Sequence, residues 1–249
     1  MAQAPGAGQP RIRLHVAAPL SEGLEVVLTR DQAHYLFGVM RQVEGASVAL
    51  FNGADGEWTS EIVAAGKKEG RLVCQARLRP QEIPPDLWLL FAPLKKARTD
   101  FVAEKAAEMG CRRVLPVFTQ YTNAERVNRE RLQAHAVEAA EQCGLLSVPE
   151  VAEPVSLEAA LASWPDGRQL LFCDETRAGA PAVSVLHAAG PGPWAVLVGP
   201  EGGFSPEEGA RLRGLSFAHP ASLGPRVLRA DTAAVAALAL FQATLGDWR

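Results

Sequence analysis

Short apolar segments separated by turn residues predict a β-rich domain over residues 11–80. Segments rich in β-branched and apolar residues lie at 13–16, 24–28, 47–51, 59–63 and 71–78, with Gly, Asn and Asp between them. This pattern is typical of strands joined by tight turns. Residues 31–41 differ, because apolar side chains follow Asp31 at helical spacing. We therefore expect a small β-barrel that contains one helix.

The pattern changes after three prolines at positions 80, 84 and 85. A continuous apolar run at 87–92 is typical of a strand buried on both faces, and a helical pattern over 98–109 ends at Gly110. The alternation continues with strands at 113–118, 169–173, 194–199 and about 217–221, and with helices at 129–145, about 181–188, 206–213 and 231–245. This order predicts an α/β domain with a mostly parallel sheet covered by helices, and a domain boundary near 80–86.

Two glycine-bearing loops near the end of the chain predict a ligand pocket. Each loop, at 198–205 and at 223–232, follows an apolar run and precedes a helical pattern. Ligands bind at such strand-to-helix turns in α/β proteins. We expect one shared pocket whose binding residues are Val198, Gly199, Pro200, Glu201, Gly203, Leu223, Gly224, Arg226, Val227 and Leu228.

The loops lack the motifs of several common enzyme classes. There is no G-x-x-x-x-G-K-[ST] phosphate loop, no G-x-G-x-x-G dinucleotide fingerprint and no G-x-S-x-G nucleophile elbow. Ser205 is better placed to cap a helix that begins at Pro206. What remains is a pocket built largely from backbone groups, with Glu201, Arg226 and Arg229 at its rim. Such a pocket suits a ligand with an adenine, a ribose and a charged tail.

Composition narrows the class of protein. The 249 residues, 48% of them hydrophobic, can bury a full core, and no apolar run approaches a membrane span. Residues 1–10 lack the features of a signal peptide, and we expect a flexible tail there. The widely spaced Cys74, Cys111, Cys143 and Cys173 predict reduced thiols in a cytoplasmic protein, with no metal site.

Charge leaves the question of nucleic-acid binding open. The net charge of −3 argues against indiscriminate binding. Between Lys95 and Arg131, however, the chain has nine basic and five acidic residues. A local basic face and a solvated helix surface of mixed charge both fit this stretch.

The glycine loops carry a family resemblance. GPEGGFSPEE followed by SLGPRVLRADTAAVAAL resembles the bacterial small-subunit ribosomal RNA methyltransferase E family, uridine N3-methyltransferases of the SPOUT superfamily. The resemblance extends through most of the chain. It includes Lys95-x-x-Arg98, Lys105-x-x-Glu108-Met-Gly110, Arg113-Val-Leu-Pro116, Glu138-Ala-Ala-Glu-Gln142, Arg13 with Pro19-Leu, and Ala33-His34-Tyr35-Leu36 with Arg41.

This resemblance implies a fold and an activity. It implies a PUA-like β-barrel RNA-binding domain at 11–82 and a SPOUT methyltransferase domain at 83–249 that contains a deep trefoil knot. It also implies S-adenosyl-L-methionine as cofactor, a homodimer, 16S rRNA as the RNA partner, and no membrane partner. The alanine-rich final helix fits a dimer interface, and it fits an ordinary buried helix equally well.

The resemblance also implies roles for individual residues. Arg229 is expected to stabilise the negative charge that develops on the uracil oxygens during methyl transfer. Glu201 is a second catalytic candidate. Its preferred role, however, is structural, with its carboxylate holding the loop by accepting backbone N–H bonds. Asp231 and Thr232 are expected to cap the last helix. The RNA-binding candidates are Arg13, His34, Arg41, Lys95, Arg98 and Arg126, and His34 fits a packed barrel residue equally well.

One departure from the family pattern and two other functions stay open. After Glu141-Gln142, many family members carry an arginine, whereas this chain has Leu145 and Leu146. Either another residue, such as Arg126 or Arg129, takes over the task, or the segment is structural. The alternatives are a SPOUT methyltransferase of tRNA or large-subunit rRNA and a non-catalytic RNA-binding assembly factor. A metabolic α/β enzyme would leave the barrel unexplained.

Overall fold

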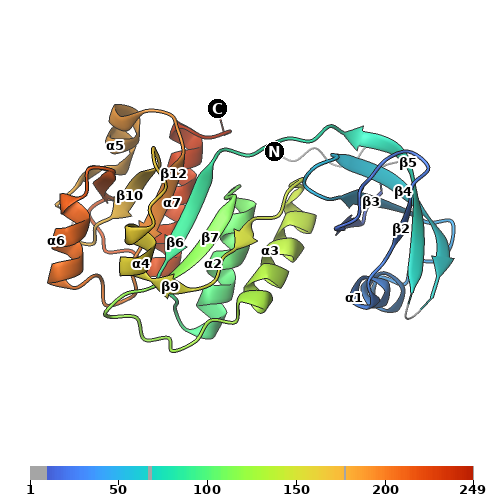
Figure 1. The fold of residues 1–249 in the computed structure, drawn as a ribbon, viewed down its shortest axis with the longest axis horizontal. Coiled ribbons are helices and arrows are strands. Elements are labelled where there is room, and N and C mark those ends of the chain that lie inside the picture. Colours follow the sequence, from blue (N-terminus) through green and yellow to red (C-terminus); the bar gives the residue numbers. More distant parts are fainter. Residues whose placement is uncertain (1–9, 67–68, 177, 249) are drawn as a thin grey trace. The chain divides into compact units, whose positions relative to one another are not determined.

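The chain forms two compact units in the computed structural model, which describes residues 10–66, 69–176 and 178–248 (Figure 1). The first unit runs to Ile83 and also includes Ala140–Val148, a segment that the sequence placed in the second domain. The second unit comprises Pro84–Ala139 and the residues from Pro149 onward. Except for Pro10, the expected tail at 1–10 lies outside the described residues.

The first unit is built on a five-stranded sheet with the order β1-β3-β4-β5-β2. Strand β1 runs parallel to β3, and the other neighbours are antiparallel. Three register shifts between β4 and β5 add twist and bend to the sheet. All five predicted strand positions are confirmed, at β1 (Arg13–His15), β2 (Glu25–Val27), β3 (Ser47–Phe51), β4 (Glu57–Ala65) and β5 (Gly70–Arg79).

The helix of the first unit differs in kind from the expected one. It begins as α1 (Arg30–Ala33), which Thr29 caps rather than Asp31, and continues as the π-helix η1 (His34–Val39). In the π-helix the Met40 N–H donates to the Tyr35 carbonyl, five residues back. A single continuous α-helix over 31–41 is therefore wrong, because apolar spacing over so few residues does not separate an α turn from a wider π turn.

The second unit is an α/β layer structure whose sheet is entirely parallel. Its strand order is β11-β13-β10-β12-β6-β7-β8, and β9 also pairs with β7. Five strand positions confirm the predicted alternation, at β6 (Leu87–Phe91), β7 (Arg113–Phe118), β10 (Gln169–Cys173), β12 (Trp194–Val198) and β13 (Ala218–Ser222). Strand β12 is buried along its whole length, as a central parallel strand requires.

Helices connect these strands and cover the sheet. The predicted helices are confirmed with small shifts at their ends, as α2 (Lys96–Glu108), α3 (Arg129–Cys143), α5 (Ala182–Ala189), α6 (Pro206–Gly214) and α7 (Ala230–Thr244). Helix α7 buries its apolar face against β12 and contacts α2 and α5. Ser205 caps α6 as predicted, and a reciprocal bond with Glu208 completes a capping box.

The sequence missed the short elements between residues 150 and 181. These are β8 (Glu150–Val151), β9 (Val155–Ser156), α4 (Leu157–Ala162) and β11 (Ala180–Pro181). Three of them are two-residue strands, and α4 has six residues, which is too short for a clear period. The three short strands form by pairing with neighbouring parallel strands, which a local sequence pattern does not reveal.

The order of the central strands determines where a site can form. Strand β10 lies between β13 and β12, so the loops that follow these three strands leave the sheet at the same edge. The described residues of these loops are 174–176 with 178–179, 199–205 and 223–229. The two predicted glycine loops are therefore neighbours, with a third loop between them that the sequence did not single out.

Candidate functional site

A cavity of about 350 Å³ lies at the carboxyl ends of β10, β12 and β13. Every residue predicted for the shared pocket lines it: Val198, Gly199, Pro200, Glu201, Gly203, Leu223, Gly224, Arg226, Val227 and Leu228. Cys173, Asp174 and Glu175 from the end of β10, together with Gly202, Ala221, Arg229, Ala230 and Ala233, complete the lining. The structure thus brings both glycine loops together in one pocket.

Two of the pocket glycines are required by neighbouring side chains. At Gly203, whose φ is +72°, a Cβ would lie 2.4 Å from Glu175 Oε1. At Gly199, a Cβ would lie 2.7 Å from the Phe204 ring. The sequence attributed these glycines to close approach of a ligand, whereas here they also make room for Phe204 and for Glu175, which lines the pocket.

The loop after β10 is held by a buried carboxylate. Asp174 has a fully buried side chain and accepts hydrogen bonds from Arg213 Nε at 2.9 Å and from the Thr176 hydroxyl at 2.6 Å. Burial opposes ionisation of Asp174, but the hydrogen bonds from Thr176 and Arg213 outweigh it and lower its pKa. Asp174 is therefore a charged anchor that fixes one wall of the pocket.

Glu175 connects this wall to the next loop. Its Oε1 accepts the backbone N–H of Phe204 at 2.9 Å, so the loops after β10 and β12 are joined across the cavity. The sequence missed both Asp174 and Glu175. The available signal was their position directly after a predicted parallel strand, which is where α/β ligand sites collect polar groups.

Arg98 lies at the pocket rim between two carboxylates. Its Nη1 is 3.4 Å from Glu201 Oε1, and its Nε is 3.6 Å from Asp231 Oδ2. Glu201 was expected to accept backbone N–H bonds, but in the structure its carboxylate forms an ion pair with the Arg98 guanidinium. Arg98 therefore joins α2 to the loop after β12 and to the first turn of α7. About a third of its side chain stays exposed, so donors remain available to a ligand.

Arg226 and Arg229 provide further positive charge at the cavity. Both line the pocket, and both are exposed. Within the described residues neither guanidinium has a hydrogen bond or ion pair. Arg229 is the N-cap residue of α7. The expected capping by Asp231 and Thr232 is therefore wrong, because the helix begins at Ala230 and both residues lie in its first turn.

The cysteine in the pocket is unsuited to nucleophilic chemistry. Burial, reinforced by the charge of Glu175, raises the pKa of Cys173 to about 12, so its thiol stays protonated near neutral pH. Cys111 is also buried, and its pKa is raised for the same reason. No group of three or more His, Cys, Asp or Glu side chains with metal-binding geometry occurs in the part of the chain that the structure describes.

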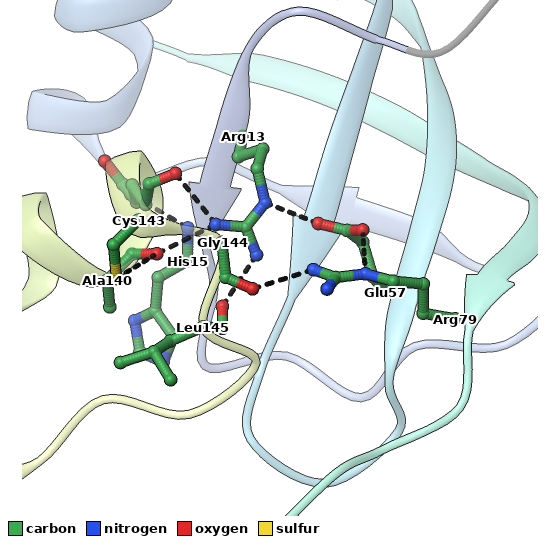
Figure 2. A network of polar contacts seen from close by, with 9 residues as sticks. Arg13, His15, Glu57, Arg79, Ala140, Cys143, Gly144 and Leu145 are labelled. Atoms are coloured by element: carbon green, nitrogen blue, oxygen red, sulfur yellow. Dashed lines mark hydrogen bonds and ion pairs between the residues drawn. The ribbon is translucent and has the colours of Figure 1, made fainter. Parts of the chain in front are cut away.

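Arg13, a predicted RNA contact, is a structural residue. Its Nε donates to Glu57 at 2.5 Å, its Nη1 to the carbonyls of Ala140 and Glu141 at 2.8 Å, and its Nη2 to the Leu145 carbonyl at 2.6 Å (Figure 2). The guanidinium also packs 4.5 Å from the centre of the Phe51 ring. Four of five N–H groups are occupied, and 15% of the side chain is exposed. These contacts give Arg13 a structural role, and its contact with phosphate stays a prediction.

Glu57 completes this arginine cluster. Its second carboxylate oxygen accepts from Arg79 Nε at 2.8 Å, and Arg79 also donates to the Gly144 carbonyl at 2.9 Å (Figure 2). Burial acts against ionisation of Glu57, but the hydrogen bonds from Arg79 and Arg13 prevail and lower its pKa. Glu57 thus holds the two arginines, which donate to carbonyl groups at the end of α3 that have no partner within the helix.

The apolar segment at 145–148 is structural, which resolves one of the open alternatives. Leu146 is buried with Phe51 and Ala140, and Leu145 and Val148 pack against them. Apolar side chains at these positions extend the core of the first unit.

The remaining predicted RNA contacts are exposed. His34 and Arg41 are exposed in the first unit, and Lys95 and Arg126 in the second. Lys95 is the N-cap residue of α2, three residues before Arg98. Their positions are compatible with RNA contact, which stays a prediction.

Two family models match this chain. The RNA methyltransferase domain model matches residues 81–242, and the RNA methyltransferase PUA domain model matches residues 28–73. The ribosomal RNA small subunit methyltransferase E of Rickettsia conorii is 27% identical, over 91% of this chain and 93% of its own length. That of Bacillus subtilis is 26% identical, over 85% of this chain and 87% of its own length.

Solved structures share the fold. A putative methyltransferase of Legionella pneumophila in complex with S-adenosylmethionine matches with a TM-score of 0.83 and 29% identity, covering 95% of this chain and 98% of that protein. A ribosomal RNA small subunit methyltransferase E of Neisseria gonorrhoeae, at 24% identity, has a TM-score of 0.85 over 96% of this chain and 99% of its own. Among the described residues of this chain, none of the helices has the length and apolar character to cross a membrane.

Proposed function

The chain belongs to the RNA methyltransferase family, and on that premise we propose that it transfers a methyl group from S-adenosyl-L-methionine to N3 of one uridine in 16S rRNA. The curated relatives support the choice of RNA, because they are small-subunit rRNA methyltransferases that match over most of their length. The substrate, the cofactor and the target atom together form the proposal.

One observation carries this proposal: the two glycine loops enclose a single cavity lined mainly by backbone and small apolar groups. Backbone N–H and C=O groups suit the edge of an adenine, and the carboxylates of Glu175 and Glu201 suit the positive charge of the methionine portion. When bound, S-adenosyl-L-methionine supplies an electrophilic methyl group on a sulfonium. The residues present therefore fit this cofactor.

Arg229 is the residue that we propose acts on the uracil. As N3 loses its proton, negative charge develops on O2 and O4, and a nearby cation stabilises it. Arg229 lines the cavity, is exposed and is not engaged by other described residues. Its position as the N-cap residue of α7 gives it a rigid base. Methyl transfer otherwise depends mainly on holding the acceptor in line with the sulfonium.

Glu201 has a supporting role in this proposal. Its carboxylate faces Arg98, so the two side chains fix the rim where the base enters. This arrangement places the RNA-binding candidate Arg98 at the pocket, while Lys95 and Arg126 provide cationic groups for phosphates in the same unit. His34 and Arg41 are proposed to contact RNA from the PUA-like domain at 11–82.

We further propose that the domain at 83–249 contains the deep trefoil knot of the SPOUT superfamily and that the protein is a cytoplasmic homodimer. Support for the dimer comes from the outer side of α7, where Val235, Ala236, Ala239 and Leu240 are only half-buried. Phe101 on the neighbouring α2 is 39% exposed. Small residues on this surface would allow a second copy to pack closely.

Mass spectrometry of rRNA tests the proposed function. In cells that lack the protein, one N3-methyluridine of 16S rRNA should disappear, and the intact gene should restore it. The Arg229→Ala variant should restore it poorly while binding S-adenosyl-L-methionine normally in calorimetry. Product on tRNA or large-subunit rRNA alone would overturn the choice of RNA. Absence of cofactor binding by the intact protein would favour a non-catalytic assembly factor.

A further inference from the structure

Tyr121 is an exposed aromatic residue next to the cavity that neither the pocket nor the core accounts for. It follows β7 by three residues and is 42% exposed. In a parallel sheet the carboxyl end of β7 lies at the same edge as the ends of β12 and β13. Tyr121 therefore lies at the edge of the sheet that also carries the cavity.

The loop that carries Tyr121 is firmly held. The Thr119 N–H donates to the Thr122 hydroxyl at 2.9 Å, and the Thr122 N–H donates back to the Thr119 carbonyl at 3.1 Å. The Gln120 N–H donates to Glu208 Oε1 at 2.9 Å. The other oxygen of Glu208 accepts the N–H of Ser205, so one carboxylate joins this loop to the loop after β12. Little conformational entropy remains for a ligand to remove from this loop.

The side chain of Tyr121 begins directly against the pocket wall. A Cβ added at Gly202 would lie 3.3 Å from Tyr121 Cβ and 3.8 Å from Cγ. Gly202 itself lines the cavity, and its φ is outside the left-handed region. Glycine at this position is therefore explained by contact with Tyr121 rather than by backbone conformation. The side chain of Tyr121 therefore lies against Gly202, a residue of the cavity lining.

The charged groups near Tyr121 favour a polyanion as the occupant of this surface. Arg98 reaches the adjacent Glu201 from α2, and Lys95 and Lys96 at the start of α2 are exposed. Two carboxylates on this side are engaged, since Glu201 faces Arg98 and Glu208 binds two backbone N–H groups. A rigid exposed aromatic beside available cations is the arrangement that binds single-stranded nucleic acid by stacking on its bases.

We propose that Tyr121 stacks on a base of the RNA strand that presents the methyl acceptor, next to the target nucleotide. This inference rests on the proposed function. A nucleotide that enters the cavity must leave its own stack, and this exposes the face of its neighbour. The Tyr121 ring replaces the lost stacking partner of that neighbouring base. Tyr121 is thus a positioning residue for RNA and has no contact with the reacting atoms.

Three full-length variants test this role: Tyr121→Ala, Tyr121→Phe and the control Val183→Ala, which alters an exposed apolar residue on α5. Tyr121→Ala should weaken binding to a 16S rRNA fragment, measured by fluorescence anisotropy, by about tenfold, because stacking contributes roughly that factor. It should also lower kcat/KM for methyl transfer through KM for RNA. Tyr121→Phe should stay within about twofold of wild type, and all three should bind S-adenosyl-L-methionine normally.

Several outcomes overturn the proposal. It fails if Tyr121→Ala binds and methylates RNA like wild type, or if Tyr121→Phe is as impaired as Tyr121→Ala. A loss of cofactor affinity equal to the loss of RNA affinity would show that Tyr121 supports the loop instead. If wild type binds the rRNA fragment without methylating it, the proposed function fails while anisotropy still decides the role of Tyr121. If wild type binds no RNA, both fail.

Discussion

Arg13 in the first unit and Arg98 in the second both lie next to carboxylates, but their surroundings give them different roles. Arg13 donates four hydrogen bonds of 2.5–2.8 Å to Glu57 and to backbone carbonyls. Arg98 is more exposed, and its two carboxylate partners are 3.4 and 3.6 Å away. The number of close acceptors and the degree of burial, rather than the residue type, separate a structural arginine from one available to a ligand.

The largest expected effect on stability comes from removing the buried arginine. Arg13→Ala should lower the free energy of unfolding by about 3–5 kcal/mol, because it breaks a buried ion pair and leaves helix-end carbonyls without donors. Urea unfolding of the full chain measures this. The matched control is Arg71→Ala, whose pair with Glu25 is nearly half exposed and should contribute less than about 1 kcal/mol. Equal effects of the two substitutions would contradict the structural role.

A change of pH should sharpen the same contrast. The pKa of Glu57 is lowered in the folded protein, so its contribution to stability is complete above its unfolded pKa and is lost as pH falls through the folded value. Glu57→Gln should therefore lower the free energy of unfolding near neutral pH. The difference in this free energy between the variant and wild type should become smaller as the pH falls. Thermal unfolding across pH measures this difference. A constant difference would mean that the charge of Glu57 does not matter.

The pocket wall should show an effect of intermediate size. Asp174→Asn should weaken binding of S-adenosyl-L-methionine about tenfold, or roughly 1.4 kcal/mol, because a neutral amide cannot accept from Arg213 and Thr176 as the carboxylate does. Calorimetry provides the measurement. Asp166→Asn, which alters an exposed carboxylate, serves as the control. Unchanged affinity in Asp174→Asn would show that the loop after β10 is ordered without this anchor.

The smallest effect on stability is expected for Arg98. Arg98→Ala should change the free energy of unfolding by less than about 1 kcal/mol, as is usual for partly exposed pairs. It should nevertheless reduce kcat/KM for methyl transfer, and Arg98→Lys should recover part of the loss. A stability loss as large as that of Arg13→Ala would remove the contrast between the two arginines.

Sequence pattern predicted most of the framework and the pocket lining. Segments with a strong pattern, such as β12 and α7, were predicted well. A strand buried on both faces leaves a continuous apolar run, and a helix buried on one face leaves apolar residues at a helical period. The glycine loops predicted the cavity, since two such loops after neighbouring parallel strands converge at one edge. Short elements such as β9 and α4 depend on neighbouring strands for their existence and leave no comparable signal.

The interactions that decide residue roles could not be predicted in the same way. Arg13 looked like a phosphate ligand because its partners, the carbonyls of Ala140 and Leu145, are far away in sequence. Glu175 was missed because its role is to accept one backbone N–H from another loop. Tyr121 became significant only through its contact with Gly202. Each role depends on a long-range pairing, which local periodicity does not encode.

The return of residues 140–148 to the first unit has a consequence for synthesis of the chain. Arg13 is 127 residues ahead of Ala140, whose carbonyl it binds. At about 5–20 residues per second, these partners emerge from the ribosome roughly 6–25 seconds apart. During that interval Arg13 can pair with Glu57, but its other N–H groups lack the carbonyls that they bind in the folded protein. Translation speed between codons 84 and 148 therefore sets how long the nascent chain is exposed to aggregation and to chaperones.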